Sequence, residues 1–394
     1  MSQSETITPL EMIERLIGFP TVSTDSNLAL IDYARSYLAG HGIDSRLTFD
    51  ADHRKANLFA TIGLNCAGGV VLSGHTDVVP VAGQPWQTDP FRLHRSGDRL
   101  YGRGTCDMKS FVAIALAAVP AFKAAALRRP IHLALSYDEE LGCLGAPKML
   151  RDIAENLPRP ALAIIGEPTS MRLANRHKGS LAIRTILTGR DGHSSATHRG
   201  LNAIASANEF ISFLQNMAEE FKTAGPFDES FDPPYTTLNI GVVSGGTAAN
   251  IIARRCEVVW DFRPLPAVEP ESIIQRARTF LEGELLAHMR RVAPEAAVEM
   301  TPLYFVPPLV PEGASPAEAL FRAIGDNSAA VGVAFGTEAG QFQRAGIPAV
   351  VFGPGSIEQA HQPNEYITID QVEACMGFMD KLCTWAASGA TWAR

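Results

Sequence analysis

Two kinds of apolar pattern alternate over residues 5–175. In some segments the apolar residues recur three and four positions apart, which predicts amphipathic helices. These segments are 9–19, 29–42 and 109–125. Shorter runs are apolar at nearly every position and predict buried strands. These runs are 69–75, 131–138 and 161–167. Helices that alternate with buried strands are typical of an α/β fold in which helices flank a mixed, mostly parallel sheet.

The pattern changes after about residue 179. The next segments read in turn as a strand, a helix, two strands, a helix and a strand, at 180–190, 202–221, 236–246, 256–266, 271–289 and 296–306. The order βαββαβ is that of the ferredoxin-like unit. Helix–strand alternation then resumes. We therefore predict that residues 179–305 form a domain inserted into another, which consists of residues 1–178 and 306–394.

Composition excludes several classes of protein. The chain has 394 residues, 46% of them hydrophobic and 19% charged, as in an ordinary globular protein of two domains. A formal net charge of −8, without a Lys/Arg block, argues against nucleic acid as a partner. No run approaches the length of a membrane span, and the N-terminus lacks the signature of a signal peptide. The six cysteines form no CxxC, so we expect reduced thiols and a cytoplasmic location.

Residues with metal-binding side chains follow the predicted strands or lie near Gly-rich turns. They are His75, Asp77, Asp107, Glu139, Glu140, Glu167 and His361. A lone His-x-Asp is more often a surface turn, and an adjacent Glu pair is usually solvated. However, ligands of open α/β sheets bind beyond the carboxyl ends of the strands. The repeated placement of these clusters at such ends favours a single metal site.

A site for two divalent ions needs one bridging carboxylate, and one imidazole and one carboxylate for each ion. Five residues supply this set: His75, Asp107, Glu140, Glu167 and His361. Asp77 can accept a hydrogen bond from the second nitrogen of His75 and fix its tautomer. Glu139 is then free to act as a general base. The sequence therefore predicts a two-metal hydrolase whose ligands accept zinc, cobalt or manganese.

Other catalytic chemistries have weaker support. Cys106 lies beside Asp107, but no catalytic His–Asn pairing surrounds it, so a small buried neighbour of the metal site is the favoured interpretation. The chain has no GxSxG motif, which disfavours a serine hydrolase of the α/β type. A non-catalytic binding protein with this fold would be expected to lack the base or a ligand, and none is missing.

Five motifs together resemble the signature blocks of the di-zinc aminoacylase family. They are SGHTDVVPV, GRGTCDMKS, YDEELGCLGA, IIGEPT and FGPGSIEQAHQPNEYI. The family includes acetylornithine deacetylase, succinyl-diaminopimelate desuccinylase, aminoacylase and glutamate carboxypeptidase. The last motif, preceded by FGTEAGQF, most resembles the acetylornithine deacetylase branch. This implies removal of the acetyl group from N²-acetyl-L-ornithine in arginine biosynthesis. Another N-acyl-amino-acid deacylase, a desuccinylase or a dipeptidase is the alternative.

The resemblance also implies a role for each residue. One zinc ion is bound by His75 and Glu167, the other by Glu140 and His361, and both by Asp107. Glu139 is the general base and Asp77 supports His75. The peptide bond between Asp107 and Met108 is expected to be cis.

The inserted domain contributes residues in the same family. There, the resemblance implies a lid histidine, His193, that stabilises the oxyanion in a neighbouring subunit. Asn250 is expected near the substrate carbonyl and Arg263 on its free carboxylate, which a guanidinium binds through two parallel hydrogen bonds. The alternative for Arg263 is an intramolecular ion pair. A lid that acts on a second subunit implies a homodimer.

Overall fold

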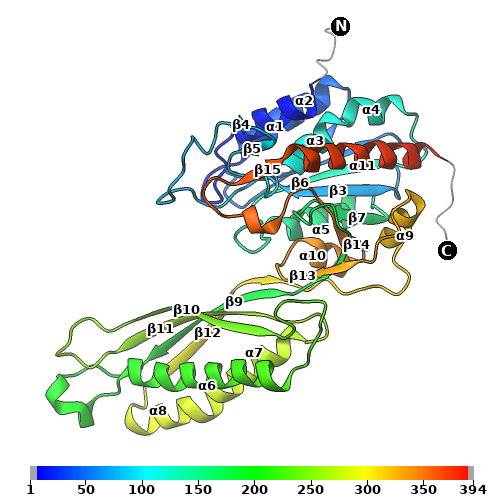
Figure 1. The fold of residues 1–394 in the computed structure, drawn as a ribbon. Helices are drawn as coiled ribbons and strands as arrows, with labels where there is room; N and C mark the ends of the chain where they lie inside the picture. The colour runs from blue at the N-terminus through cyan, green and yellow to red at the C-terminus, as the bar shows by residue number, and fades with distance from the viewer. Residues whose placement is uncertain (1–6, 389–394) are drawn as a thin grey trace. The chain divides into compact units, whose positions relative to one another are not determined.

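The computed structural model describes residues 7–388 and divides the chain into two compact units (Figure 1). The first unit comprises Met1–Arg176, Leu309–Val333 and Thr337–Arg394. The second comprises His177–Pro308 and Ala334–Gly336. The sequence did not indicate that the short segment Ala334–Gly336 belongs with the second unit. Within residues 7–388, every helix is too short or too polar to span a membrane.

An eight-stranded mixed sheet forms the centre of the first unit. Its strands, in spatial order, are β1 (Ser45–Phe49), β2 (Ala56–Ile62), β6 (Ile131–Ser136), β3 (Val70–His75), β7 (Leu162–Ile165), β14 (Ala349–Val351), β8 (Ala174–His177) and β13 (Val331–Val333). The neighbours β6, β3, β7 and β14 run parallel, whereas β1, β2 and β8 pair antiparallel. The predicted α/β class with a mixed, mostly parallel sheet is confirmed.

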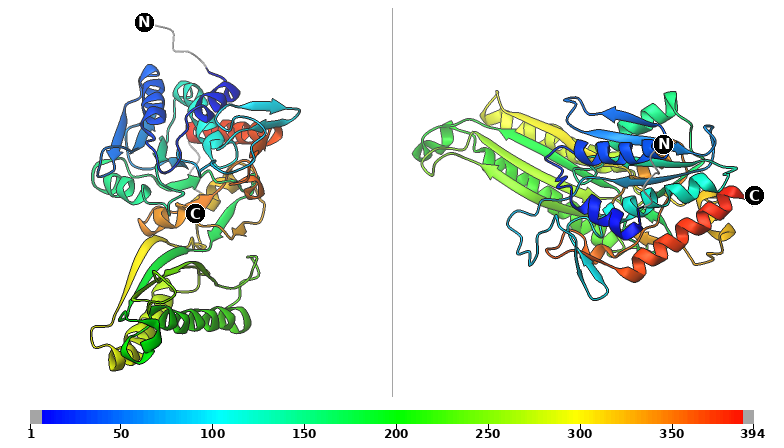
Figure 2. Two further views of the ribbon diagram at one scale, coloured as in Figure 1. Left: turned by 90° about the vertical axis from the view of Figure 1, so that its left-hand side faces the viewer. Right: turned by 90° about the horizontal axis from the view of Figure 1, so that it is seen from above.

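Alternate side chains of the central strands enter different cores. In β3, Val70 and Leu72 pack with one hydrophobic cluster and Val71 with another. This alternation follows from the two-residue period of a strand. Helices therefore cover both faces of the sheet (Figures 1 and 2). One face packs against α1 (Pro9–Ile17), α2 (Leu28–Gly40), α3 (Lys109–Ala117), α4 (Val119–Ala124), α9 (Pro316–Ala323) and α11 (Ile369–Ala387). The other packs against α5 (Ala146–Asn156) and α10 (Ala339–Arg344).

The predicted helices of the first unit keep their positions, with one local difference. The single helix expected over 109–125 is divided into α3 and α4 at Ala118. Pro120, in the first turn of α4, has no N–H to continue the ladder of α3. Thr8 caps α1 through a reciprocal capping box with Glu11.

A small three-stranded sheet, which the sequence did not indicate, lies beside the large one. Its strands are β4 (His94–Ser96), β5 (Arg99–Tyr101) and β15 (Tyr366–Thr368). β15 runs antiparallel to β5, with Tyr366 opposite Tyr101. This pairing ties the segment that precedes Asp107 to the segment that follows His361.

The second unit is a four-stranded antiparallel sheet with helices on one face. The elements are β9 (Ser180–Thr188), α6 (Ala203–Ala224), β10 (Thr237–Gly245), β11 (Arg255–Arg263), α7 (Pro270–Thr279), η2 (Phe280–Leu285), α8 (Leu286–Val292) and β12 (Ala297–Val306). The spatial order β10-β11-β9-β12 is that of the ferredoxin-like unit predicted from the sequence. Its core centres on Trp260, which meets Phe210 edge-on and stacks on Phe262.

Candidate metal centre

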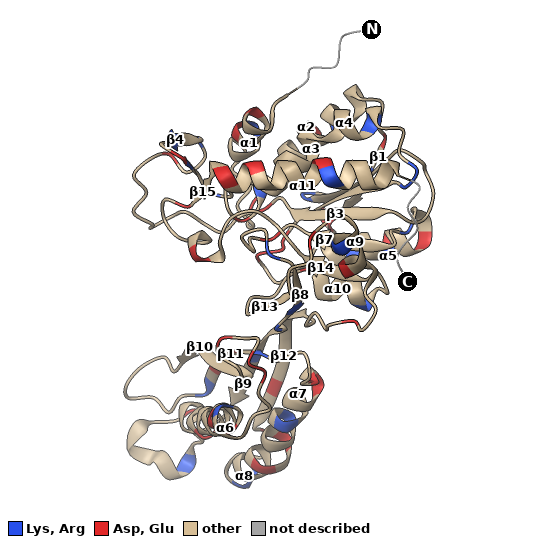
Figure 3. Ribbon diagram, turned by 45° about the vertical axis from the view of Figure 1, so that its right-hand side comes forward, with Lys and Arg blue, Asp and Glu red and all other residues tan. Residues whose placement is uncertain are grey.

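Three parallel strands deliver ligand-type side chains to one edge of the large sheet. His75 is the last residue of β3, Glu139 and Glu140 follow β6, and Glu167 follows β7. Because these strands are parallel neighbours, their carboxyl ends meet. Acidic residues are coloured red on these loops in Figure 3. The sheet therefore assembles residues that are nearly one hundred positions apart in the sequence.

A close approach of α3 brings Asp107 to the same edge. Asp107 lies just before α3, and the Asp107–Met108 peptide bond is cis, as expected. Gly166 follows β7, and a Cβ atom there would lie 2.0 Å from the ring of Phe111 in α3. Glycine at this position lets α3 pack against the end of β7. The carboxylates of Asp107 and Glu167 thus reach the same site.

The carboxylate of Asp107 lies between two imidazoles. Its Oδ1 is 3.0 Å from His75 Nε2, and its Oδ2 is 3.2 Å from His361 Nε2. Glu167 Oε1 is 3.7 Å from His75 Nε2, on the first side. Glu140 Oε2 is 3.0 Å from His361 Nε2, on the second. The structure thus brings together all five residues that the sequence predicts as ligands, with Asp107 in the shared position.

Two groups of these side chains lie close enough to hold a metal ion. One consists of His75, Glu139 and Glu167, and the other of His75, Asp107 and Glu140, with ligand atoms within 4.8 Å of one another. Imidazole nitrogens and carboxylate oxygens are the donors of catalytic zinc sites. The donor set fits divalent ions by its chemistry. Glu139, which we expected to act as a base, lies as close to His75 and Glu167 as a ligand would.

Buried charge dominates the electrostatics of the cluster. Burial raises the pKa of Glu139 to about 8 and that of Glu167 well above its usual range. Burial also disfavours ionisation of Asp107, but hydrogen bonds from His361 and His75 outweigh it and lower the pKa of that carboxyl. Hydrogen bonds to Asp107 and, with a smaller effect, to Glu140 raise the pKa of His361 to about 10. Four carboxylates face two imidazoles, so a bound cation would reduce the repulsion between the carboxylates.

Asp77 supports the site in a different way from the one expected. His75 Nδ1 donates to the main-chain carbonyl of Asp77 at 2.9 Å, whereas the Asp77 carboxylate is 3.7 Å from that nitrogen. A carbonyl only accepts, so Nδ1 carries a proton, and Nε2 is the nitrogen that faces the site and can bind an ion in place of its own proton. The carboxylate instead accepts from Ser23 Oγ at 2.7 Å and from the main-chain N–H groups of Glu139 and Glu140 at 3.1 and 3.3 Å. Asp77 therefore orients the Glu139–Glu140 turn as well as His75.

The second unit places its predicted residues at opposite ends of one strand. His193 and Asn250 lie together, because His193 bridges to Ile251 and Ser194 N–H donates to the Asn250 carbonyl at 3.0 Å. Ile251 lies four residues before Arg255, the first residue of β11. Arg263 ends β11, with Nε 3.5 Å from Asp261 Oδ1, and its side chain is partly exposed. The ion pair considered as the alternative for Arg263 is present, but such exposed pairs contribute little.

Reasoning from the sequence missed several residues of the site. Glu365 and Arg103 form a fully buried ion pair of 2.7 Å beside Asp107, and isolated charges in a sequence resemble solvated ones. Cys143 donates its thiol proton to Glu139 Oε1 at 3.2 Å. Their only sequence signal is proximity to predicted ligands.

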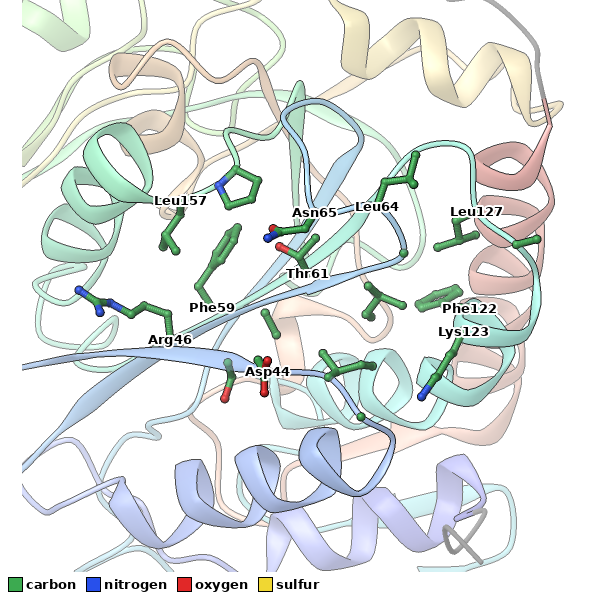
Figure 4. A pocket seen from close by; sticks show the side chains of 18 residues that line it. Asp44, Arg46, Phe59, Thr61, Leu64, Asn65, Phe122, Lys123, Leu127 and Leu157 are labelled. Atoms are coloured by element: carbon green, nitrogen blue, oxygen red, sulfur yellow. The ribbon is translucent and has the colours of Figure 1, made fainter. Parts of the chain in front are cut away.

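A cavity of about 730 Å³ lies elsewhere in the first unit (Figure 4). Residues from β1, β2 and α4 and from nearby loops line it, among them Phe59, Phe122 and Leu157. None of its lining residues belongs to the predicted site. The cavity therefore has no part in the chemistry of the cluster.

Fold and cluster together define a metal-dependent hydrolase that acts on amide bonds. The chain belongs to Peptidase family M20/M25/M40, whose profile matches residues 71–384. It is 33% identical over 380 residues to the acetylornithine deacetylase of Pasteurella multocida (strain Pm70), covering 95% of this chain and 96% of that relative. It is 36% identical over 381 residues to the acetylornithine deacetylase of Proteus mirabilis (strain HI4320), covering 95% of each.

Solved structures agree on the fold. The M20 family metallo-carboxypeptidase Sso-CP2 from Sulfolobus solfataricus superposes with a TM-score of 0.75 at 18% identity, covering 97% of this chain and 99% of that one. The Bacillus subtilis YXEP protein, a dinuclear metal binding peptidase, superposes with a TM-score of 0.66 at 17% identity, covering 96% and 97%. Both likenesses span the two units of the chain. They show the fold, and the sequence relatives show the family.

Proposed function

We propose that this enzyme removes the acetyl group from N²-acetyl-L-ornithine and releases ornithine and acetate. The observation that carries the chemistry is the Asp107 carboxylate, with one oxygen toward His75 and the other toward His361. Such a residue can be shared by two ions, and a pair of ions suits amide hydrolysis. The named deacetylase relatives, matched over nearly their full length, support the choice of substrate.

The proposed ligands divide into two sets around Asp107. His75 and Glu167 hold one divalent ion, and Glu140 and His361 hold the other. Zinc fits this mixture of imidazole and carboxylate, and cobalt is an acceptable substitute. When bound, the ions supply the Lewis acidity that polarises the amide carbonyl.

Glu139 is the proposed proton carrier. Its Oε2 lies 4.0 Å from His75 Nε2, so the carboxylate borders the cluster, while Oε1 is held by the Cys143 thiol. Nearby positive charge lowers the pKa of a buried carboxyl. Ionised Glu139 can then take a proton from the attacking water and return it to the leaving amine. This transfer regenerates the carboxylate for the next cycle.

Residues from the second units of two different chains are proposed to bind one substrate molecule. His193 and Asn250 adjoin the start of β11, whereas Arg263 ends it, eight residue steps or about 26 Å away. An N-acyl amino acid is much shorter than this separation. One chain would therefore supply His193 and Asn250 and another Arg263, which supports a homodimer. Arg263 would bind the α-carboxylate and His193 the oxyanion.

The same proposal locates the enzyme in the cytoplasm and in arginine biosynthesis. The six cysteines are free thiols in the structure, which suits a reducing compartment.

A substrate panel tests the proposed activity. Zinc-reconstituted enzyme is assayed with acetylornithine, acetylmethionine, succinyl-diaminopimelate and a dipeptide. We expect the highest kcat/KM with acetylornithine. A higher value with any of the other three would assign the same chemistry to that substrate and contradict the proposal.

A further inference from the structure

His361 is the least enclosed of the five proposed ligands. Its side chain is 52% exposed, whereas that of Asp107 is 8% exposed. Its backbone φ is 63°, in the left-handed region that residues other than glycine seldom adopt. Packing therefore does not hold the imidazole in place. The main chain that carries it must be held by other contacts.

Gln84 supplies such a contact. Its Nε2 donates to the main-chain carbonyl of His361 at 3.0 Å. Its Oε1 accepts from Arg103 at 2.6 Å and from the indole N–H of Trp86 at 3.0 Å. Because both ends of the amide are engaged, its orientation is defined, with the donor aimed at His361.

Arg103 connects Gln84 to the segment that carries Asp107. Its guanidinium also donates to the Glu365 carboxylate at 2.7 Å and to the Gln362 carbonyl at 3.4 Å. The Glu365 carboxylate accepts from three main-chain N–H groups: Gly104 at 3.1 Å, Cys106 at 2.7 Å and Asp107 at 3.0 Å. The side chains of Arg103 and Glu365 are 1% and 0% exposed, so each charge depends on these partners. One continuous network thus links the main chains of Asp107 and His361.

We propose that Gln84, held by Arg103 and Glu365, is a positioning residue that aims His361 at Asp107 and Glu140. The inference rests on the proposed two-ion site and extends it to the residues that hold its most exposed ligand. The network fixes the main chain of His361 in its left-handed conformation. Gln84 therefore governs affinity for the ion that His361 binds, and it leaves the ion at His75 and Glu167 unaffected.

Two variants and a matched control separate this role from general stability. Gln84→Ala removes the whole amide. Gln84→Glu keeps an acceptor for Arg103 and Trp86 but loses the donor to His361. Gln87→Ala is the control, because Gln87 is an exposed glutamine of the same loop whose main-chain N–H contacts Asn364.

Calorimetric titration of Zn²⁺ into metal-free protein is the measurement. The wild type is expected to show two binding events, and His361→Ala identifies the one that depends on that histidine. Both Gln84 variants should weaken this event about tenfold or more, as residues behind a metal ligand do. The other event and the Gln87→Ala titration should match the wild type, and the thermal unfolding of the metal-free proteins should differ little.

Two results would overturn the inference while the two-ion site stands. One is wild-type affinity for both ions in the Gln84 variants. The other is equal weakening of both events together with early unfolding of metal-free protein, which indicates a structural role only. A wild type that binds fewer than two ions would instead refute the proposed site, and the inference with it.

Discussion

Replacing Glu139 with glutamine separates catalysis from metal binding. One carboxylate oxygen of Glu139 borders the cluster, 4.0 Å from His75 Nε2, and the other accepts from the Cys143 thiol at 3.2 Å. Glutamine has nearly the same shape and keeps an oxygen for the thiol. It cannot accept a proton from water at neutral pH. The variant should therefore retain both ions and lose the proton transfer.

The expected loss follows from the size of general-base catalysis. A positioned base accelerates reactions by about 10²–10⁴-fold. Since each tenfold corresponds to about 1.4 kcal/mol, the activation barrier should rise by about 3–5 kcal/mol. The fold should not suffer, because the substitution removes a buried carboxyl whose pKa burial raises to about 8. The metal-free variant should unfold no earlier than the wild type.

The assay combines kcat for acetylornithine with the zinc content of the same preparation. Glu155→Gln, at an exposed position in α5, is the control and should leave both quantities unchanged. A kcat within tenfold of the wild type would refute Glu139 as the base. Loss of one zinc ion together with activity would make Glu139 a ligand instead.

Three further predictions address the ligands, the subunits and the pH dependence of stability. Asp107→Asn replaces one of the two shared oxygens by an NH₂ group that cannot bind a cation. Metal analysis should therefore find that at least one ion is lost, and activity should be abolished. A variant that retains two ions would contradict the shared role of Asp107. Mixed dimers of His193→Ala and Glu139→Ala chains should recover part of the wild-type activity, because one of their two sites has both residues intact. If confirmed mixed dimers recover no activity, the lid does not act on the partner subunit. Burial lowers the pKa of His177 to about 4. Between about pH 6.5 and pH 4, therefore, this imidazole binds a proton only in the unfolded chain. The free energy of unfolding consequently falls as the pH falls. Urea unfolding at pH 7 and pH 5 should show that the wild type loses about 2 kcal/mol more than His177→Asn; equal losses would contradict this assignment.

The main features of the fold could be predicted because they follow from local patterns. The runs that contain Val70–Leu72 and Leu162–Ile165 are apolar on both faces, as strands between two helical layers must be. The βαββαβ order of the second unit followed equally from periodicity. The division of the helix at Ala118 was missed, because alanine-rich sequence on both sides of Pro120 suggested one continuous helix.

The candidate site was only partly accessible from the sequence. His75, Glu140 and Glu167 could be expected to meet, because each lies at or just beyond the carboxyl end of a strand of one sheet. The role of Asp77 depended on the turn after β3, which brings the carbonyl closer than the carboxylate to His75 Nδ1. Glu365 and Arg103 lie 262 positions apart in the chain, and no local pattern reveals such a pair. Residues that hold the ligands are therefore harder to predict than the ligands.

Anomalous diffraction from crystals of zinc-loaded protein tests the two-ion site most directly. We expect two peaks on either side of the Asp107 carboxylate, one beside His75 and Glu167 and the other beside Glu140 and His361. A single peak, or zinc bound by a different set of residues, would contradict it.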